Sequence, residues 1–279
     1  MTHFIDDKYA RQQRSEESFM LLEELTSLLI DNKDIGFKTR TRVNFIIDRI
    51  SLIVKESYDQ IAYKYTQVRS DFPSKMDREF IEKLIFQARE LVRDGILGDH
   101  SQVLHLLDVG TGSGRDLRYF KKHYSDVRAI GIDISSVFIK ILHQLAEEGE
   151  IENSSYYELD MRNLNKFENA TFDIVRHNAS LLHLPVTDLG LGADEAIAES
   201  YRVLKPYGIV YIWAKAGQGL KIIDTNEGLG ERIFQLFTEE LLSNILKRNG
   251  FQILSIETRE EIRSSNPFDM IAAFAQKVC

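Results

Sequence analysis

The chain has 279 residues, of which 43 % are hydrophobic and 28 % are charged. This composition is ordinary for a globular protein and excludes a largely disordered chain. Its one cysteine, Cys279, excludes an intramolecular disulfide framework and a metal site built from several cysteines. The net charge of −8 argues against general nucleic-acid binding, which needs a basic surface. No targeting or membrane-spanning segment stands out, so we expect a soluble, cytoplasmic protein.

The first 99 residues are predicted to be mainly helical. Apolar residues recur at helical spacing over residues 19–29 and 43–54, and the second pattern continues beyond Tyr58. A further helix is expected to have Asp77 as its N-cap and to end before Gly95.

After residue 100 the pattern changes to short apolar runs that alternate with helical stretches. This alternation predicts an α/β fold with a parallel sheet covered by helices on both faces. The last two strands have no helix between them, which predicts an antiparallel hairpin. The expected strands are 103–109, 127–132, 156–159, 172–176, 208–214, 251–258 and 268–276, and the expected helices are 116–124, 136–147, 194–203 and 238–249.

A glycine-rich loop joins the first of these strands to a helix. Glycines at positions 110, 112 and 114 allow a tight turn and the close approach of a ligand. The spacing is G-x-G-x-G, which differs from the G-x-G-x-x-G of dinucleotide sites. Asp108 would repel a pyrophosphate but attract an ammonium or sulfonium group. The loop therefore favours a cationic nucleoside over NAD, although glycines in such turns can also be purely structural.

Two further acids follow the next two strands. Asp133 ends the second strand, 19 residues beyond Gly114, where a carboxylate can bind both hydroxyls of a ribose. The alternative is that Asp133 or Ser135 only caps the helix that follows. Asp160 follows the third strand and could accept from a purine amine, with the alternative of a solvated loop acid. The polar residues after the fourth strand lie where open α/β sheets bind ligands.

The order of these four elements resembles that of the class I S-adenosylmethionine-dependent methyltransferases. The turn over residues 202–208 is similar to the R-x-L-K-P-G-G turn of that family, with Tyr207 in place of the first glycine. Residues 178–185 and the entry helix from Tyr58 resemble a branch that acts on small molecules and includes tellurite-resistance-type enzymes. The resemblance covers roughly residues 55–277. It suggests a methyltransferase domain at 55–279 and an N-terminal helical extension or cap at 1–54.

The resemblance implies a Rossmann-like, seven-stranded sheet of order 3-2-1-4-5-7-6, with strand seven antiparallel. It also implies S-adenosylmethionine as cofactor, S-adenosylhomocysteine as product and a small-molecule acceptor. By this likeness the glycine loop contacts the methionyl part, the acid after strand two holds the ribose and the residues after strand three frame adenine. The implied cofactor-binding residues are Asp108, Gly110, Thr111, Gly112, Gly114, Asp133, Ile134, Asp160, Met161, Asn178 and Ala179.

Methyl transfer from a sulfonium is an in-line displacement with a neutral thioether as leaving group. It needs alignment and exclusion of water, and a base only when the acceptor must lose a proton. His183 is the candidate base, with a packed loop histidine as the alternative. Tyr58, Tyr65 and Arg69 are candidate lid residues, and Trp213 either lines the acceptor pocket or fills the core. No metal site is expected.

Three matters stay open from the sequence. The protein could bind S-adenosylmethionine without methylating, as a sensor or scaffold. An NAD-dependent oxidoreductase is disfavoured by the spacing of the loop. The apolar residues of 1–54 predict that this segment either caps the acceptor pocket or forms a homodimer, and a capping role predicts that its deletion spares cofactor affinity while abolishing methyl transfer.

Overall fold

The computed structural model describes residues 2–30, 36–68, 72–97, 103–152, 155–224, 231–260 and 269–278. Arg69 and Cys279 lie outside these ranges. The helices are α1 (Thr2–Ile30), α2 (Phe37–Val68), α3 (Lys75–Arg93), α4 (Arg115–His123), α5 (Ser136–Glu147), the one-turn η1 (Leu181–His183), α6 (Ala193–Val203) and α7 (Glu239–Arg248). The strands are β1 (Leu104–Val109), β2 (Val127–Asp133), β3 (Tyr156–Glu158), β4 (Phe172–Asn178), β5 (Leu204–Lys215), β6 (Gly219–Asp224), β7 (Glu231–Leu236), β8 (Phe251–Arg259) and β9 (Met270–Lys277).

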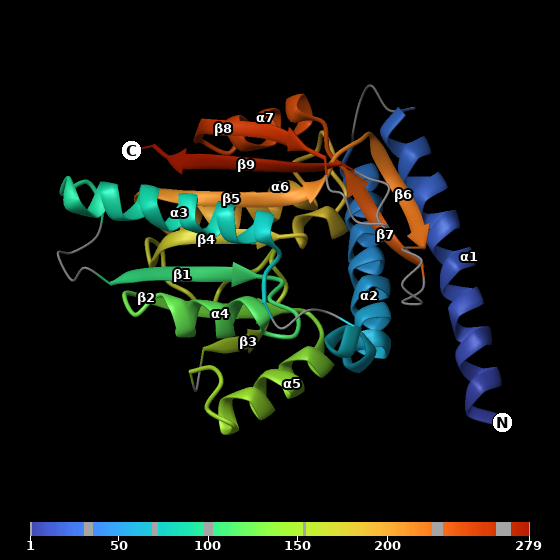
Figure 1. Cartoon of the computed structure of the whole chain (residues 1–279). Helices are drawn as coiled ribbons and strands as arrows, with labels where there is room; N and C mark the ends of the chain where they lie inside the picture. The colour runs from blue at the N-terminus through green and yellow to red at the C-terminus, as the bar shows by residue number, and fades with distance from the viewer. Residues whose placement is uncertain are drawn as a thin grey trace.

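Seven strands form one sheet in the order β3-β2-β1-β4-β5-β9-β8 (Figure 1). Strands β1 to β5 are parallel to one another, whereas β9 is antiparallel to both β5 and β8. Renumbered without the β6–β7 hairpin, this is the predicted order 3-2-1-4-5-7-6, so the predicted fold class is confirmed. The carboxyl ends of the five parallel strands lie at the sheet edge that faces α2 (Figure 1).

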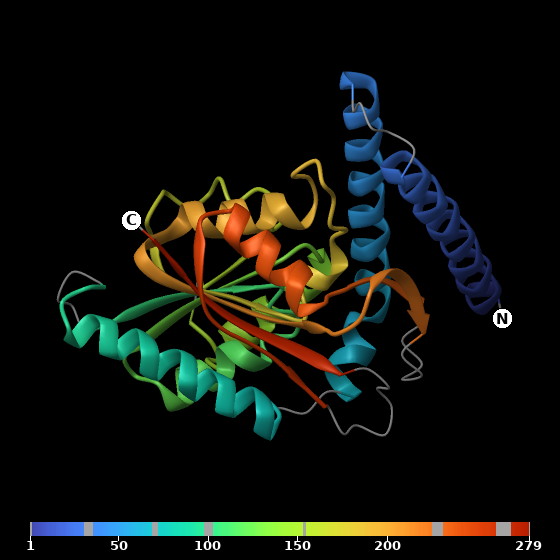
Figure 2. The same cartoon turned by 90° about the horizontal axis from the view of Figure 1, so that it is seen from above.

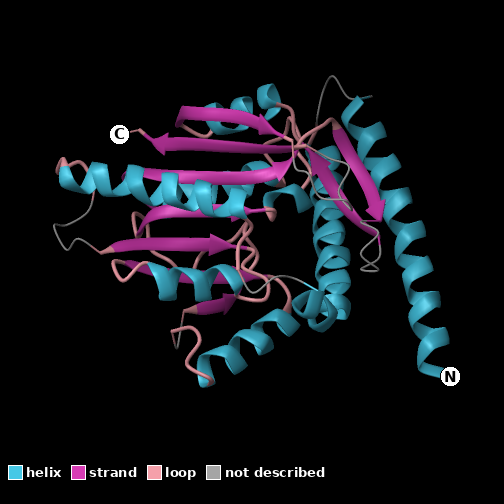
Figure 3. Ribbon diagram, in the orientation of Figure 1, coloured by secondary structure: helices cyan, strands magenta, loops and turns pink. Residues whose placement is uncertain are grey.

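Helices cover both faces of the sheet. Helices α3 and α4 lie on one face and α6 and α7 on the other (Figure 2). Each face has its own apolar core, because side chains of successive strand residues point to opposite faces. Leu106 and Ile174 pack under α3, whereas Leu107 and Val175 pack under α6 and α7. Figure 3 shows the strands of the sheet beside one another, with helices packed against them.

Local signals explain where the helices begin. Ser135 caps α5, its Oγ accepting from the backbone N–H of Phe138 at 3.2 Å. The prediction that Asp77 caps α3 is wrong. Ser74 is the N-cap, and Asp77 is the third helical residue, which accepts from the Ser74 backbone in a capping box. Both residue types suit an N-cap, and the apolar pattern alone did not show where the first turn begins.

The N-terminal helices and the β6–β7 hairpin form a separate layer beside the sheet edge (Figure 2). Leu25 of α1 and Ile46 and Ile50 of α2 share an apolar cluster with Ile233 of β7. The hairpin was not predicted from the sequence. The expected boundary at residue 54 falls inside α2, which runs without a break from the extension into the segment that contains Tyr58. None of the described helices has the length and hydropathy needed to cross a bilayer.

Candidate functional site

A pocket lies at the carboxyl ends of the parallel strands, between them and α2. The loops after β1, β2, β3 and β4 form one wall, and α2 forms the opposite wall. The lining is mainly apolar, with a few polar groups. The residues are Ser51, Val54, Tyr58, Tyr65, Val109, Gly110, Gly112, Ile132, Asp133, Ile134, Phe138, Leu159, Asp160, Met161, Asn178, Ala179, Ser180, His183 and Leu184.

Two glycines of the loop after β1 shape the floor of this pocket. A Cβ on Gly110 would collide with the Cβ of Ser180, so this glycine lets the loops after β1 and β4 approach each other. Gly112 has a φ of +56°, and a Cβ there would meet no atom within 4 Å. Its backbone therefore borders open space that a ligand can enter. Gly114 instead adopts the left-handed conformation at the start of α4, next to Leu142.

Asp133 stands at the end of β2 and holds the glycine loop in place. One carboxylate oxygen accepts from the N–H of Gly112 at 2.8 Å, and the other accepts from the N–H of Ser135 at 2.9 Å. Burial raises the pKa of Asp133 to about 6, although both hydrogen bonds act to lower it. Each oxygen retains a lone pair, so the carboxylate can accept further hydrogen bonds from a ligand in the pocket.

The loop after β3 brings an ion pair to the pocket. Asp160 lines the pocket, and its carboxylate accepts from the Arg162 guanidinium at 2.7 Å. The same guanidinium reaches α2, where it donates to Asp48 at 2.7 Å. Arg162 was not singled out from the sequence, because only the fold brings Asp48 to it. Leu159 and Met161 line the same wall of the pocket.

The end of β4 and the turn after it place three polar or small residues against the glycine loop. Asn178 lines the pocket, and its Nδ2 donates to Asp116 at 3.0 Å. Ala179 has a φ of +57°, a conformation that is unfavourable for alanine. The N–H of Ala179 donates to the carbonyl of Trp213 at 2.8 Å, which helps to hold this turn. Ser180 follows and lines the pocket next to Gly110.

Tyr58 of α2 and His183 of η1 meet across the pocket. The Tyr58 hydroxyl lies 2.8 Å from Nε2 of His183, and Nδ1 of His183 lies 3.0 Å from the carbonyl of Ile233. A carbonyl only accepts, so Nδ1 carries the proton and Nε2 accepts from Tyr58. Burial, together with the charges of Arg232 and Lys215, lowers the pKa of His183 to about 3, although the hydrogen bond with Ile233 acts to raise it. His183 is therefore a neutral imidazole whose acceptor nitrogen is already engaged.

Asp59, the neighbour of Tyr58, attaches α2 to the sheet. Its carboxylate accepts from Oγ of Ser135 at 2.6 Å and from the N–H of Val137 at 3.2 Å, at the start of α5. A negative charge is favourable at this end of a helix. Lys55, one turn earlier, donates to the carbonyl of Ile134 at 2.9 Å. These contacts fix the position from which Tyr58 enters the pocket.

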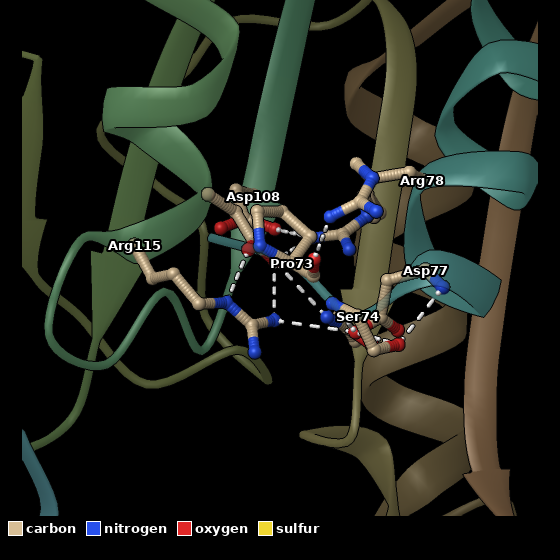
Figure 4. A network of polar contacts seen from close by, with 9 residues as sticks. Pro73, Ser74, Asp77, Arg78, Asp108 and Arg115 are labelled. Atoms are coloured by element: carbon tan, nitrogen blue, oxygen red, sulfur yellow. Dashed lines mark hydrogen bonds and ion pairs between the residues drawn. The ribbon is translucent and has the colours of Figure 1, made fainter. Parts of the chain in front are cut away.

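A buried charge network lies behind the glycine loop. Arg176 of β4 donates to Asp108 at 2.9 Å and to Asp116 at 2.7 Å. Burial acts to raise the pKa of Asp116, but Arg176 and Arg115 outweigh it and the pKa is lowered. Figure 4 shows Asp108 and Arg115 beside the start of α3, where Arg115 lies 3.7 Å from Asp77. Asp108 is only 2 % exposed and does not line the pocket, so its predicted contact with a ligand ammonium stays a prediction.

Comparison with known proteins agrees with this arrangement. Residues 106–208 match the family model described as a methyltransferase domain. A probable methyltransferase, ltbC, of Aspergillus luteorubrus is 35 % identical over 111 residues. That match covers 38 % of this chain and 38 % of the relative, so the chain spans well under half the length of this curated protein.

Solved structures extend the likeness over most of the chain. A 1,6-didemethyltoxoflavin-N1-methyltransferase of Burkholderia thailandensis has a TM-score of 0.56 and 16 % identity, over 84 % of this chain and 91 % of that one. The [4+2]-cyclase SpnF has a TM-score of 0.54 and 21 % identity, over 82 % and 96 %. Residues 106–208 thus match a methyltransferase domain, and the fold around them is that of the class I, S-adenosylmethionine-dependent methyltransferases. The likeness to a tellurite-resistance-type branch stays a prediction.

Two predicted site residues have other positions in the methyltransferase domain. Trp213 is buried outside the pocket, and its ring lies 5.2 Å from that of Phe80 in α3, so the alternative of core packing is correct. Thr111 is buried behind the loop and does not line the pocket. Arg69 lies outside the described residues. Among the described residues, no group of three or more His, Cys, Asp or Glu side chains is placed to hold a metal ion.

Other pocket residues were not predicted. Ser51 and Val54 come from the part of α2 that was assigned to the extension, and Phe138 carries no motif. Ser180 lies within the segment 178–185 but was not singled out as a site residue. A clue was present for the α2 residues, because the helical pattern of 43–54 continues in register to Tyr58. Tyr65 lines the pocket with its ring centroid 6.1 Å from that of Tyr58, and its role as a lid residue stays a prediction.

Proposed function

We propose that this protein transfers the methyl group of S-adenosylmethionine to a small-molecule acceptor. The observation that carries the proposal is the pairing of Gly112 and Asp133 at neighbouring strand ends. Gly112 leaves its backbone open to the pocket, and Asp133 presents a buried carboxylate beside it. This combination suits a ligand that has both a ribose and a part that must approach the backbone closely.

The other pocket residues support the same orientation of the ligand. Asp133 would accept from the ribose hydroxyls, and Met161 with Asp160 would lie beside the adenine. Gly110 and Asn178 would border the methionyl part. When bound, S-adenosylmethionine supplies a methyl group on a positively charged sulfur, which leaves as a neutral thioether. The protein must then align the acceptor and exclude water, which the apolar lining and the helix α2 favour.

A titration experiment tests the cofactor. Calorimetry of the full-length protein should show saturable binding of S-adenosylmethionine and S-adenosylhomocysteine, and no binding of NAD at the same concentration. A screen of acceptors for release of S-adenosylhomocysteine then tests the activity. Binding of NAD in place of both adenosyl ligands would overturn the proposal.

The same experiment tests a second function. A protein described as a [4+2]-cyclase has a similar fold, so the fold by itself does not establish methyl transfer. A non-catalytic sensor or scaffold would bind S-adenosylmethionine without consuming it. Saturable binding with no release of S-adenosylhomocysteine across a broad acceptor panel would favour that function.

A further inference from the structure

The hydroxyl of Ser180 has no hydrogen-bond partner among the residues that the structure describes. Ser180 is 5 % exposed and lines the pocket. A buried hydroxyl without a partner is unfavourable, so such a group is expected to gain a partner when a ligand binds.

The backbone holds Ser180 in this position at a cost in free energy. The preceding residue, Ala179, has the left-handed φ of +57°, and Gly110 leaves the space that the Ser180 side chain occupies. Backbone strain of this kind persists where the surrounding structure enforces it and is concentrated at functional sites. Ser180 is also one turn before His183, and both residues line the pocket.

The described side chains on this wall do not include an available base. His183 accepts at Nε2 from Tyr58, and its Nδ1 donates to the carbonyl of Ile233. Asp133 holds the glycine loop and is the proposed partner of the cofactor ribose, and Asp160 is paired with Arg162. An acceptor that must lose its proton during transfer would find no group here to take it. An acceptor that ionises in water before it binds needs none.

Two cations, Arg232 and Lys215, lie close enough to His183 to act on its charge. Arg232 donates through Nη1 to the Tyr58 oxygen at 3.1 Å. Nζ of Lys215 lies 5.6 Å from the centre of the Phe234 ring, which in turn lies 5.0 Å from the His183 ring. These two cations favour an anion over an ammonium group at the neighbouring subsite.

We propose that Ser180 donates its hydroxyl hydrogen to an acceptor oxygen that binds as its anion, such as a phenolate, an enolate or a carboxylate. This inference rests on the proposed methyltransferase function. The acceptor loses its proton to water before it binds. An oxygen lone pair then forms the O–CH3 bond while the S–CH3 bond breaks and its electron pair stays on sulfur. The anion and the sulfonium become a neutral ether or ester and a neutral thioether, so charge and atoms balance.

The test uses 4-nitrophenol as a probe, because its phenolate absorbs visible light and the neutral phenol does not. The full-length protein is saturated with S-adenosylhomocysteine, which cannot donate a methyl group, and the probe is added near the pH at which it is half ionised. Binding should increase the phenolate absorbance. Ser180→Ala should weaken phenolate binding about tenfold, while calorimetry shows an S-adenosylhomocysteine affinity within twofold of the wild type. Tyr63→Phe, on the exposed side of α2, should change neither value.

Several results would overturn the inference. The absorbance could fall, which would mean that the neutral phenol is preferred, or the probe could fail to bind at millimolar concentration. Equal or tighter binding of 4-nitrobenzylamine would contradict the preference for an anion. Loss of S-adenosylhomocysteine affinity in Ser180→Ala would assign the hydroxyl to the cofactor instead. Failure of the wild type to bind S-adenosylhomocysteine would contradict the proposed function itself, and this is measured before the probe is added.

Discussion

At the scale of single residues, Asp133 joins the structure of the pocket to its proposed chemistry. Its two oxygens hold the N–H groups of Gly112 and Ser135, so it fixes both the glycine loop and the turn into α5. Its burial keeps the pKa high, near 6. The same carboxylate is the proposed partner of the ribose. Its role can therefore be tested by replacing Asp133 and by changing the pH.

Replacement of Asp133 by Asn should weaken S-adenosylmethionine binding by roughly 1.5–3 kcal/mol, because hydrogen bonds to a charged acceptor are lost. This corresponds to about a 10- to 150-fold rise in Kd, measured by calorimetry. Asp188→Asn removes an exposed acid in the loop before α6 and should leave Kd unchanged. A Kd within twofold of the wild type in Asp133→Asn would contradict the role of this carboxylate.

Affinity for S-adenosylmethionine should fall as the pH drops through about 6. The pKa of Asp133 is raised by burial, so the carboxylate is ionised above that pH and protonated below it. Only the ionised form accepts from two hydroxyls, and affinity should therefore decline about tenfold per pH unit at lower pH. Calorimetry between pH 5 and 8 checks this. Asp133→Asn should lack this decline, and an identical pH dependence in that variant would assign it to another group.

Gly112→Ala should affect both stability and binding. An alanine with φ near +56° destabilises the fold by about 1 kcal/mol, and its methyl group would enter the pocket. Gly190→Ala is a matched control, because Gly190 has a φ of +68°, open space around it and no place in the pocket. Both variants should lose similar stability in urea unfolding, but only Gly112→Ala should lose cofactor affinity. Equal affinities would show that no ligand approaches Gly112.

At the scale of elements, α2 connects the N-terminal layer to the pocket. One side of the helix packs with α1 and β7, and its Tyr58 hydrogen-bonds to His183 in the pocket. Asp59 and Lys55 bind the start of α5 and the end of β2. The helix is therefore held from both sides, and the sequence pattern Tyr58-Asp59 combines one residue in the pocket with one that attaches the helix.

Asp59→Ala should loosen this attachment. It removes the acceptor for Oγ of Ser135 and for the N–H of Val137, which are bonds of the type that cap helices. The loss of such a cap costs about 1–2 kcal/mol of the free energy of unfolding, measurable in urea. Glu56→Gln, a charge removal on the same helix, should cost less than about 0.5 kcal/mol. Equal stability of the two variants would show that the contact with α5 contributes little.

At the scale of the whole molecule, the N-terminal layer and the sheet share the pocket. Ser51 and Val54 line it, and Asp48 pairs with Arg162 beside it, although all three lie within the predicted extension of residues 1–54. The extension thus contributes to a wall of the pocket, and its role as a cap stays a prediction. Formation of a homodimer through these helices and the cytoplasmic location stay predictions.

Two deletions separate these roles. Deletion of residues 1–36 removes α1 and should leave cofactor affinity within about threefold of the wild type, because α1 does not line the pocket. Deletion of residues 1–54 also removes Ser51 and Val54 and should weaken binding more than tenfold. This differs from the expectation drawn from the sequence, in which the longer deletion spares affinity. Calorimetry distinguishes the two expectations, and light scattering of the same proteins tests the dimer.

Much of the fold could be predicted because its signals are local. The helix at 136–147 was predicted with its observed bounds, and the glycine loop and Asp133 were found from the spacing between two strands. The β6–β7 hairpin was not predicted, because its short strands depend on contacts with α1 and α2. Trp213 could not be assigned from the sequence, since its packing against Phe80 depends on the position of α3 over the sheet.

The sequence by itself determined the order of strands and helices, the doubly covered sheet and the residues at the carboxyl ends of its strands. These follow from hydrophobic period and from the short-range geometry of glycine and capping residues. Only the tertiary structure decided which distant side chains meet. Tyr58 and His183 are 125 residues apart, and Asp108 and Arg176 are 68 apart. Such contacts depend on how whole elements pack. That packing makes the candidate base a neutral histidine that is already hydrogen-bonded, and it leaves the buried Ser180 hydroxyl without a partner among the described residues.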